Sequence, residues 1–438
     1  MNRNAIADVA AHFRFAGSLE DVRELTSGLI NNSYRLTNRL PDGSARDYVL
    51  QQINTYVFKK PEQVMSNVQR VTEHLRRKLT EAGEDPARRA LRLIETVDGG
   101  TMYRDDADRC WRAYDFICDA VAYDRAGTPE HFREAGAAFG EFQRMLFDFP
   151  AGELYETIPG FHNTRQRFET FRQAVAIDRA GRVKDLAREI SFFLNREEML
   201  CSIVKKIEQG ELPLRVTHND TKMNNVMLDA QTGKALCVID LDTVMPGSAL
   251  YDYGDAVRFG ASTAAEDEED LRKVSLDMAY FRAFTDGFVS QVRGALTEEE
   301  IRLLPLGVEV LTGELAMRFL TDYIDGDLYF KTSRPDHNLI RARAQMRLLE
   351  DVEEVHPGKG YVLPGVVAHG EQHVVGLGVQ PSHYVGGVGG AAAEVCAVHR
   401  LNLMISADTR SRSSNPESID SCVAVLIFMS SSRAQTSS

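Results

Sequence analysis

The segment from His218 to Asn225, with the sequence His-Asn-Asp-Thr-Lys-Met-Asn-Asn, constrains the fold of this chain more than any other feature. It follows a short run from Leu214 to Thr217 whose apolar alternation predicts a β-strand. Because this strand ends at His218, the residues after it form a tight polar loop on a rigid support. We expect His218 itself to be a packed, hydrogen-bonded scaffold residue rather than a proton carrier.

Two charged side chains of this loop suit the transfer of a phosphoryl group. A carboxylate at Asp220 can accept the proton of an attacking hydroxyl group and aim its oxygen at a γ-phosphate. Lys222 follows two residues later and can neutralise the charge of the same phosphate. We therefore predict that Asp220 and Lys222 are catalytic residues.

The residues after the loop supply candidate ligands for Mg²⁺. The amide oxygen of Asn225 is a hard, neutral ligand. Residues 226–228 and 235–239 have the pattern of a β-hairpin, which would return Asp240 to the side of Asn225. The spacing H-x-D-x-K-x-x-N, followed by a strand that ends in Asp, is typical of eukaryotic-type kinases. The alternative is that these Asp and Asn residues are ordinary turn and cap residues.

The stretch from Thr217 to Phe259 contains HNDTKMNNVMLD, VIDLDTVMPG and YDYGDAVRFG, and it resembles the aminoglycoside-phosphotransferase superfamily. Within that superfamily the chain is most similar to the N-acetylhexosamine 1-kinases. This closer resemblance includes segments at 28–34, 48–59 and 318–329. Altogether it covers about residues 15 to 355.

The resemblance implies an α+β, two-lobed, protein-kinase-like fold with a small β-rich N-lobe and a mainly helical C-lobe. It also implies ATP as donor and the anomeric hydroxyl group of N-acetylglucosamine or N-acetylgalactosamine as acceptor. Asp220 would be the catalytic base, Asn225 and Asp240 the magnesium ligands, and Arg318 and Tyr329 contacts of the sugar. An arginine on a late helix is otherwise usually a solvated or salt-bridged side chain.

The beginning of the chain predicts the lobe that holds the nucleotide. A turn containing Gly28 would fold over the triphosphate, with Asn31 or Ser33 adding hydrogen-bond donors. A single glycine in a hairpin is ordinarily only a turn residue, so this role depends on the loop downstream. The strands of this lobe are expected at residues 22–27, 33–38, 47–53, 91–95 and 110–117.

Gln51 stands where kinases usually have the ion-pair lysine of their third strand. Gln51 or Gln52 could donate a neutral hydrogen bond to the phosphates instead, while Lys59 or Lys60 could supply charge from the next loop. A missing lysine is also what a catalytically weak nucleotide-binding scaffold would show. That alternative therefore stays open beside the enzyme.

The rest of the chain is expected to be mainly helical, because its apolar residues recur with helical spacing. Pro61 stands at the start of an amphipathic helix that should pack on the sheet. The adenine is expected to bind backbone groups of a hinge at residues 113–118. The helix that starts at Pro61 is expected at residues 61–79. Further helices are expected from His131 onward and at residues 164–178, 183–209, 267–292 and 298–325.

A short connector from Met245 to Asp255 replaces the long activation segment of protein kinases, which favours a small acceptor. We expect Asp252 and Asp255 to cap a helix beginning near Ala256 and to brace the catalytic loop. Asp242 could be a supporting carboxylate or bind a second metal ion.

The resemblance implies a nucleotide-binding N-lobe at 1–113 and a catalytic and substrate-binding C-lobe at 114–358, and a change in composition sets apart a tail at 359–438. Residues 361–438 contain no lysine, twelve serines and eight glycines. We expect this tail to be poorly ordered and dispensable.

Net charge and cysteine content indicate which ligands and which cysteine chemistry to expect. A formal net charge of −13 argues against nucleic acid and favours a neutral or cationic acceptor. The six scattered cysteines contain no C-x-x-C pair and are expected to be free thiols. The sequence shows no secretory or membrane-spanning segment, so we expect a cytoplasmic monomer. Because the catalytic loop does not encode the acceptor, an aminoglycoside, choline or homoserine remains an alternative.

Overall fold

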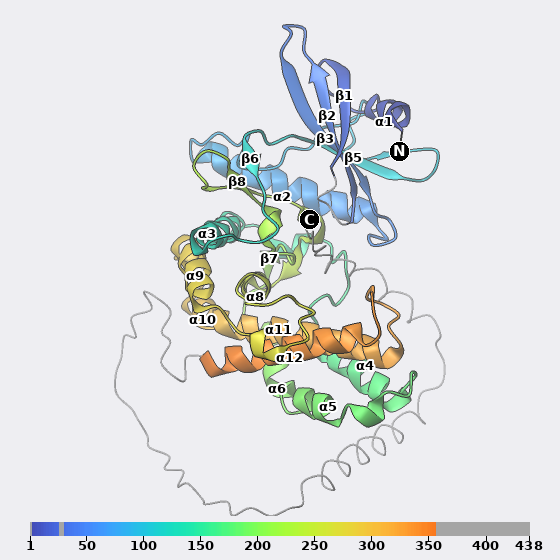
Figure 1. Cartoon of the computed structure of the whole chain (residues 1–438). Coiled ribbons are helices and arrows are strands. Elements are labelled where there is room, and N and C mark those ends of the chain that lie inside the picture. Colours follow the sequence, from blue (N-terminus) through green and yellow to red (C-terminus); the bar gives the residue numbers. More distant parts are fainter. Residues whose placement is uncertain (1, 26–29, 356–438) are drawn as a thin grey trace, which may run out of the picture.

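The computed structural model describes residues 2–25 and 30–355 (Figure 1). Gly28 and the tail predicted at 359–438 lie outside the described residues. The described part has a β-sheet region near the N-terminus and a helical region after it, which confirms the predicted α+β class. None of the described helices is both long and apolar enough to cross a membrane.

The N-terminal region is a five-stranded antiparallel sheet with the order β1-β2-β3-β5-β4. Its strands are β1 (Ser18–Leu25), β2 (Asn32–Arg39), β3 (Ala45–Ile53), β4 (Tyr103–Arg104) and β5 (Cys110–Asp115). Four of them, β1, β2, β3 and β5, match the strands expected at 22–27, 33–38, 47–53 and 110–117. The segment at 91–95 was wrongly predicted as a strand, because Leu93 makes only an isolated bridge with Tyr114.

Successive side chains along these strands point to opposite faces of the sheet, one facing the core and the other a cleft. On the core face, Leu50 and Trp111 are fully buried in a cluster with α1 (Arg3–Ala10). The next residues along the same strands, Gln51 and Arg112, point to the opposite face, where they line a cleft. The helix that packs below this face is α2 (Pro61–Glu81), which begins with its proline as predicted.

Two small sheets connect the N-terminal sheet to the helices. The predicted hairpin is present as β8 (Val226–Asp229) and β9 (Ala235–Val238), which β6 (Ala120–Val121) extends. β7 (Arg215–Thr217) pairs with β10 (Met245–Gly247) in antiparallel register. These pairings place the two ends of the predicted active site, after β7 and after β9, beside each other.

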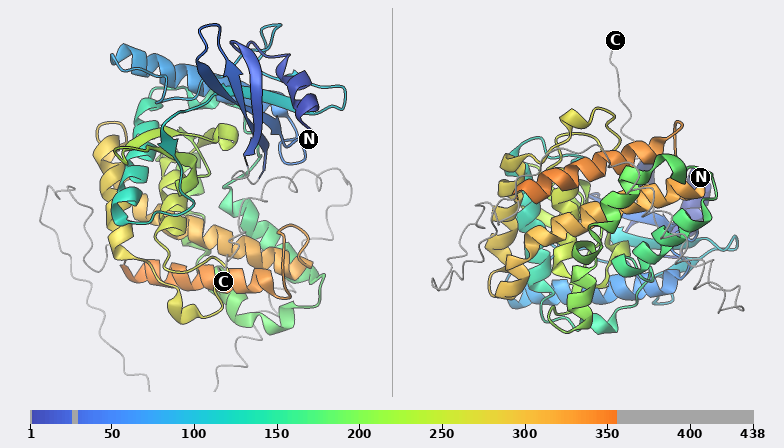
Figure 2. Two further views of the ribbon diagram at one scale, coloured as in Figure 1. Left: turned by 45° about the horizontal axis from the view of Figure 1, so that its top comes forward. Right: turned by 90° about the horizontal axis from the view of Figure 1, so that it is seen from below.

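The helical region is built on two long neighbouring helices, α11 (Leu304–Asp325) and α12 (His337–Val355), which Figure 2 shows side by side. α8 (Ala249–Gly260) crosses α11 closely, because a Cβ atom on Gly254 would lie 2.2 Å from the Gly307 carbonyl oxygen. The remaining helices are α3 (Pro129–Met145), α4 (Thr164–Ile177), α5 (Ala187–Leu194), α6 (Glu197–Leu200), α7 (Ser202–Glu208), α9 (Met278–Val292) and α10 (Glu298–Arg302).

Three of the predicted helices are divided or shorter than expected. The segment at 183–209 forms α5, α6 and α7, because it bends to follow the surface of α11. In the segment at 267–292 the helix starts only at Met278, where Asp277 caps it, and the residues before it include a short 3-10 helix at Leu271–Lys273. The segment at 298–325 is divided into α10 and α11, with Pro305 in the first turn of α11.

Candidate active site

The loop predicted as the catalytic centre begins where β7 ends, and its residues 217–222 are all buried. The His218 ring packs edge-on against two phenylalanine rings. Its Nδ1 accepts a hydrogen bond from the Asp220 backbone N–H at 3.3 Å, and its Nε2 lies 2.9 Å from the Ile239 carbonyl oxygen. Because Nδ1 accepts a hydrogen bond, the ring proton lies on Nε2, which donates to the Ile239 carbonyl oxygen. His218 therefore joins the two loops of the site as a scaffold residue, as predicted.

Asp252 holds the backbone of this loop. Its two carboxylate oxygens accept the N–H groups of His218 and Asn219, each at 2.8 Å. Burial raises the pKa of Asp252, although these hydrogen bonds oppose the shift. Asn219 has a left-handed backbone with φ 64°, so the loop needs such anchors to keep its conformation. The predicted bracing role of Asp252 is confirmed.

The predicted capping role of Asp252 and Asp255 is wrong. Both residues lie inside α8, which begins at Ala249 with Ser248 as its N-cap, rather than near Ala256. Asp255 instead accepts a backbone N–H of the catalytic loop at 3.3 Å and pairs with the arginine one turn later at 2.7 Å. α8 is thus the support on which the loop rests.

Asp220 is held on both sides by members of its own loop. Nζ of Lys222 lies 2.8 Å from its Oδ1, and Nδ2 of Asn225 donates to its Oδ2 at 3.0 Å. The same amide nitrogen also donates to the Asp220 carbonyl oxygen at 2.8 Å. The Asn225 nitrogen therefore fixes the loop, which leaves its amide oxygen as the atom suited to a cation.

Asp240 lies opposite this amide in a left-handed conformation with φ 58°. The hairpin brings it there, since the Ile239 N–H donates to the Asn225 carbonyl oxygen at 2.9 Å. Burial and the neighbouring carboxylates of Asp242 and Asp220 raise the pKa of Asp240 to about 7. Crowded carboxylates in a low-dielectric site favour a bound cation.

The donors present fit Mg²⁺. Asn225 and Asp240 offer an amide oxygen and a carboxylate, and Mg²⁺ is commonly bound by one or two protein carboxylates together with phosphate oxygens. Within the described residues no group of three or more His, Cys, Asp or Glu side chains could hold a metal ion alone. A cation here would need ligands from a bound nucleotide.

A cleft of about 390 Å³ lies between the sheet and these loops. From the sheet it is lined by Ser33 and Gln51, and from the loops by Lys222, Asn225 and Asp240. Asp220 lines it as well, so the structure brings together six of the residues predicted for phosphate, metal and catalysis. Its lining also includes residues 114–117 of the hinge expected at 113–118.

Asn31 is placed differently from this group. Its Nδ2 donates to Oδ2 of Asp242 at 2.8 Å, and its Oδ1 accepts the Asn54 backbone N–H at 3.0 Å. Both ends of the amide are therefore engaged in joining the sheet to the segment after Asp240. Asp242 is likewise paired within the protein, since it also forms an ion pair with Arg112.

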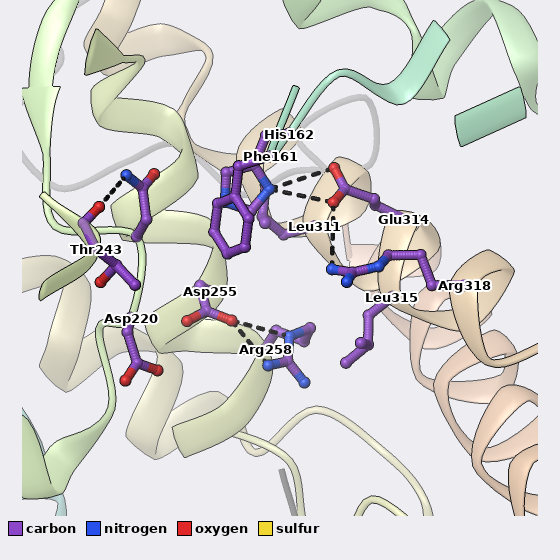
Figure 3. Close-up of a pocket in the computed structure, with 11 residues that line it drawn as sticks. Phe161, His162, Asp220, Thr243, Asp255, Arg258, Leu311, Glu314, Leu315 and Arg318 are labelled. Atoms are coloured by element: carbon purple, nitrogen blue, oxygen red, sulfur yellow. Dashed lines mark hydrogen bonds and ion pairs between the residues drawn. The ribbon is translucent and has the colours of Figure 1, made fainter. Parts of the chain in front are cut away.

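A smaller pocket lies on the other side of Asp220 (Figure 3). Arg318 and Glu314 of α11, Asp255 of α8 and His162 of the segment before α4 line it. Nδ1 of His162 lies 3.2 and 3.3 Å from the two Glu314 oxygens. Asp220 is thus the residue at which a nucleotide-sized cleft and a small pocket meet.

Arg318 carries a poorly compensated charge in this pocket. Its side chain is 9% exposed, and its contact with Glu314 is long at 3.8 Å. Burial, together with the nearby Arg167, lowers the pKa of Arg318 to about 10. Tyr329 is close enough to raise this pKa, but it does not line the pocket.

Arg112, His162 and Glu314 belong to the two cavities but were not predicted from the sequence. Arg112 had a signal, since it is the charged residue inside the apolar strand Cys110 to Tyr114. Glu314 lies one turn before Arg318 on the mainly apolar helix α11, which also marks a buried charged pair. His162 had no such signal, because only the folded chain brings it to α11.

Comparisons with known proteins agree with this geometry. Residues 21–284 match the APH family, described as the phosphotransferase enzyme family. The fold is similar to that of a microcompartment-associated aminopropanol kinase, with a TM-score of 0.55 and 15% identity over 83% of this chain and 100% of that one. It is also similar to an amicoumacin kinase in complex with AMP-PNP, Ca²⁺ and Ami, with a TM-score of 0.51 and 13% identity over 83% and 96%.

The match covers more than half of the chain and includes the catalytic loop, the hairpin and α8. The chain therefore belongs to the phosphotransferase enzyme family, the aminoglycoside-phosphotransferase superfamily that its motifs predicted.

Proposed function

We propose that this phosphotransferase transfers the γ-phosphate of ATP to the anomeric hydroxyl group of N-acetylglucosamine or N-acetylgalactosamine. The observation that carries the proposal is the position of Asp220, which lines both the nucleotide-sized cleft and the small pocket beside Arg318. A hydroxyl group entering from the pocket would meet the Asp220 carboxylate before it meets a phosphate in the cleft.

In this mechanism Asp220 orients the acceptor hydroxyl and takes its proton, while Lys222 stabilises the charge of the transferring phosphoryl group. The fixed loop, anchored by Asp252, keeps the carboxylate in place. Asn225 and Asp240 would hold Mg²⁺, which supplies charge neutralisation on the phosphates when it is bound.

The charge in the small pocket supports a neutral acceptor. Although the chain carries a formal net charge of −13, Arg318 lies beside Arg167 and shares Glu314 with His162. A cationic group placed beside Arg318 would therefore be repelled by two neighbouring arginines. The carbonyl and hydroxyl oxygens of an acetamido sugar could instead accept hydrogen bonds from the guanidinium fork of Arg318.

A kinase of a small amino alcohol is the second candidate. Asp255 and Glu314 bring two carboxylates to the pocket, and one structural neighbour is an aminopropanol kinase. A nucleotide-binding scaffold is less well supported, because Asp220, Asn225 and Asp240 form a complete catalytic set that a scaffold would not need.

The test is an acceptor panel with the full-length protein, ATP and Mg²⁺. The acceptors are N-acetylglucosamine, N-acetylgalactosamine, aminopropanol, choline, homoserine and kanamycin, each assayed separately for ADP release and product mass. The coupling of phosphorus to the anomeric proton in NMR identifies a sugar 1-phosphate. Asp220→Asn serves as the control for contaminating kinases. Product from the amino alcohols alone would support a kinase of small amino alcohols instead of a sugar kinase. No product from any acceptor would favour the nucleotide-binding scaffold.

A further inference from the structure

Arg112 is a buried cation next to the glutamine that replaces the strand-three lysine. It lies on β5 directly opposite Gln51 of β3 in the register of the sheet. Its side chain is only 1% exposed, yet it lines the same cleft as Gln51, Lys222 and Asp240. The positive charge missing from β3 is therefore present one strand away.

The contacts of Arg112 fix its guanidinium at this place. Its Nε donates to Oε1 of Gln51 at 3.0 Å, and Nε2 of Gln51 donates in turn to Oγ of Ser33 at 2.9 Å. Its Nη1 pairs with Oδ1 of Asp242. Gln51 thus acts as a neutral orienting group, and Asp242, which Asn31 also holds, acts as the counter-ion.

One end of the guanidinium remains for a ligand. Among the described residues, Nη2 of Arg112 has no hydrogen-bond partner. A buried guanidinium normally satisfies its donors, and phosphate oxygens are among its best acceptors. Arg112 also connects the sheet with the segment after Asp240, so it lies where the phosphates of a nucleotide would pass between the two.

We infer that Arg112 binds the α- and β-phosphates of the nucleotide and so performs the task of the strand-three lysine. Gln51 orients its guanidinium, and Asp242 balances its charge before the nucleotide binds. This assignment rests on the proposed use of ATP and does not depend on the identity of the acceptor.

The test compares the binding of ADP and adenosine to the full-length protein by isothermal titration calorimetry with Mg²⁺ present. In Arg112→Gln we expect the affinity for ADP to fall by about 10- to 100-fold, the range of a hydrogen bond to a charged group. The affinity for adenosine should stay within about threefold, because the lost contact is with phosphate. Arg112→Lys should lose ADP affinity partially, since an ammonium group cannot keep the bonds to Gln51, Asp242 and a phosphate together.

Trp111→Phe is the matched control, because Trp111 lies on the same strand but points to the core face and donates to Asp105 at 3.0 Å. It should weaken neither ligand selectively. A parallel loss of ADP and adenosine in the Arg112 variants would show that Arg112 only supports the fold, and unchanged ADP binding, or none in the wild type, would also overturn the inference. If Arg112→Gln does not fold, Arg112→Lys decides by the same comparison. No acceptor is present, so the outcome is separate from that of the sugar assay.

Discussion

Nζ of Lys222 lies 2.8 Å from Oδ1 of Asp220, and both side chains are at least nine-tenths buried. The proposed base and the proposed phosphate-binding cation therefore form one ion pair before any substrate is bound. A single unpaired charge would be costly in such a low-dielectric site, and here each of the two charges has the other as its partner. The loop can thus hold both charges ready in a folded, unliganded protein.

Replacing Asp220 should abolish turnover without unfolding the protein. Asp220→Asn keeps an acceptor for the Asn225 amide but removes the proton acceptor, so kcat should fall by about 10²- to 10⁴-fold. The protein should still fold and bind ADP, although its unfolding midpoint should fall because Lys222 loses its buried ion-pair partner. Asp106→Asn, an exposed aspartate, is the control and should keep wild-type kcat. A kcat of Asp220→Asn near that of the wild type would end the assignment of the base.

The local part of this site was predictable from sequence, because its geometry is set by short-range structure. A strand ending at His218 and a hairpin ending at Asp240 place the catalytic and metal residues within a few residues of their supports. Figure 3 shows the opposite case, where His162 and Glu314 meet through the packing of segments far apart in the chain. No periodicity encodes such a contact.

The same distinction explains the fold. Amphipathic α2 and the first three strands follow local patterns and were predicted. The segment at 183–209 has continuous helical periodicity, but it is divided because it must curve around α11. Arg112 was missed for a related reason, since its partner Asp242 lies 130 residues away along the chain.

Binding of a metal ion with the nucleotide should require Asp240. In the wild type we expect ADP with Mg²⁺ to raise the melting temperature more than ADP alone, because a ligand that binds only the folded state stabilises it. In Asp240→Asn the increment due to Mg²⁺ should disappear, while the increment from ADP alone should stay or grow, since a repelling carboxylate is removed. Differential scanning fluorimetry with EDTA as the metal-free reference measures both. An unchanged Mg²⁺ increment in the variant would place the metal ion elsewhere.

Removing the anchor under the catalytic loop should reduce stability. Asp252→Ala leaves the buried N–H groups of His218 and Asn219 without acceptors, at a cost of about 1–3 kcal/mol for each. We therefore expect urea denaturation to show a loss of about 2–6 kcal/mol in the free energy of unfolding, with a lower kcat as the loop loosens. Asp286→Ala, at an exposed position of α9, should cost less than about 0.5 kcal/mol. Equal stability of the two variants would contradict the bracing role of Asp252.

Arg318 should show a conflict between stability and acceptor binding. Burial and Arg167 lower its pKa to about 10, so at neutral pH the folded protein holds this charge at a cost, which Tyr329 and the long contact with Glu314 offset in part. Arg318→Gln removes the charge and leaves Glu314 with its second partner, His162. We expect the free energy of unfolding at pH 7 to stay the same or rise. This difference in the free energy of unfolding should shrink as the pH approaches 10, because the wild-type arginine then begins to lose its proton in the folded state.

The KM of Arg318→Gln for the acceptor should rise by about 10- to 100-fold, as for a lost hydrogen bond to a charged group, while the KM for ATP should not change. Steady-state kinetics in both substrates and urea denaturation test the two halves separately. A variant that is less stable but keeps its acceptor KM would make Arg318 a structural residue and remove the main support for a sugar in this pocket.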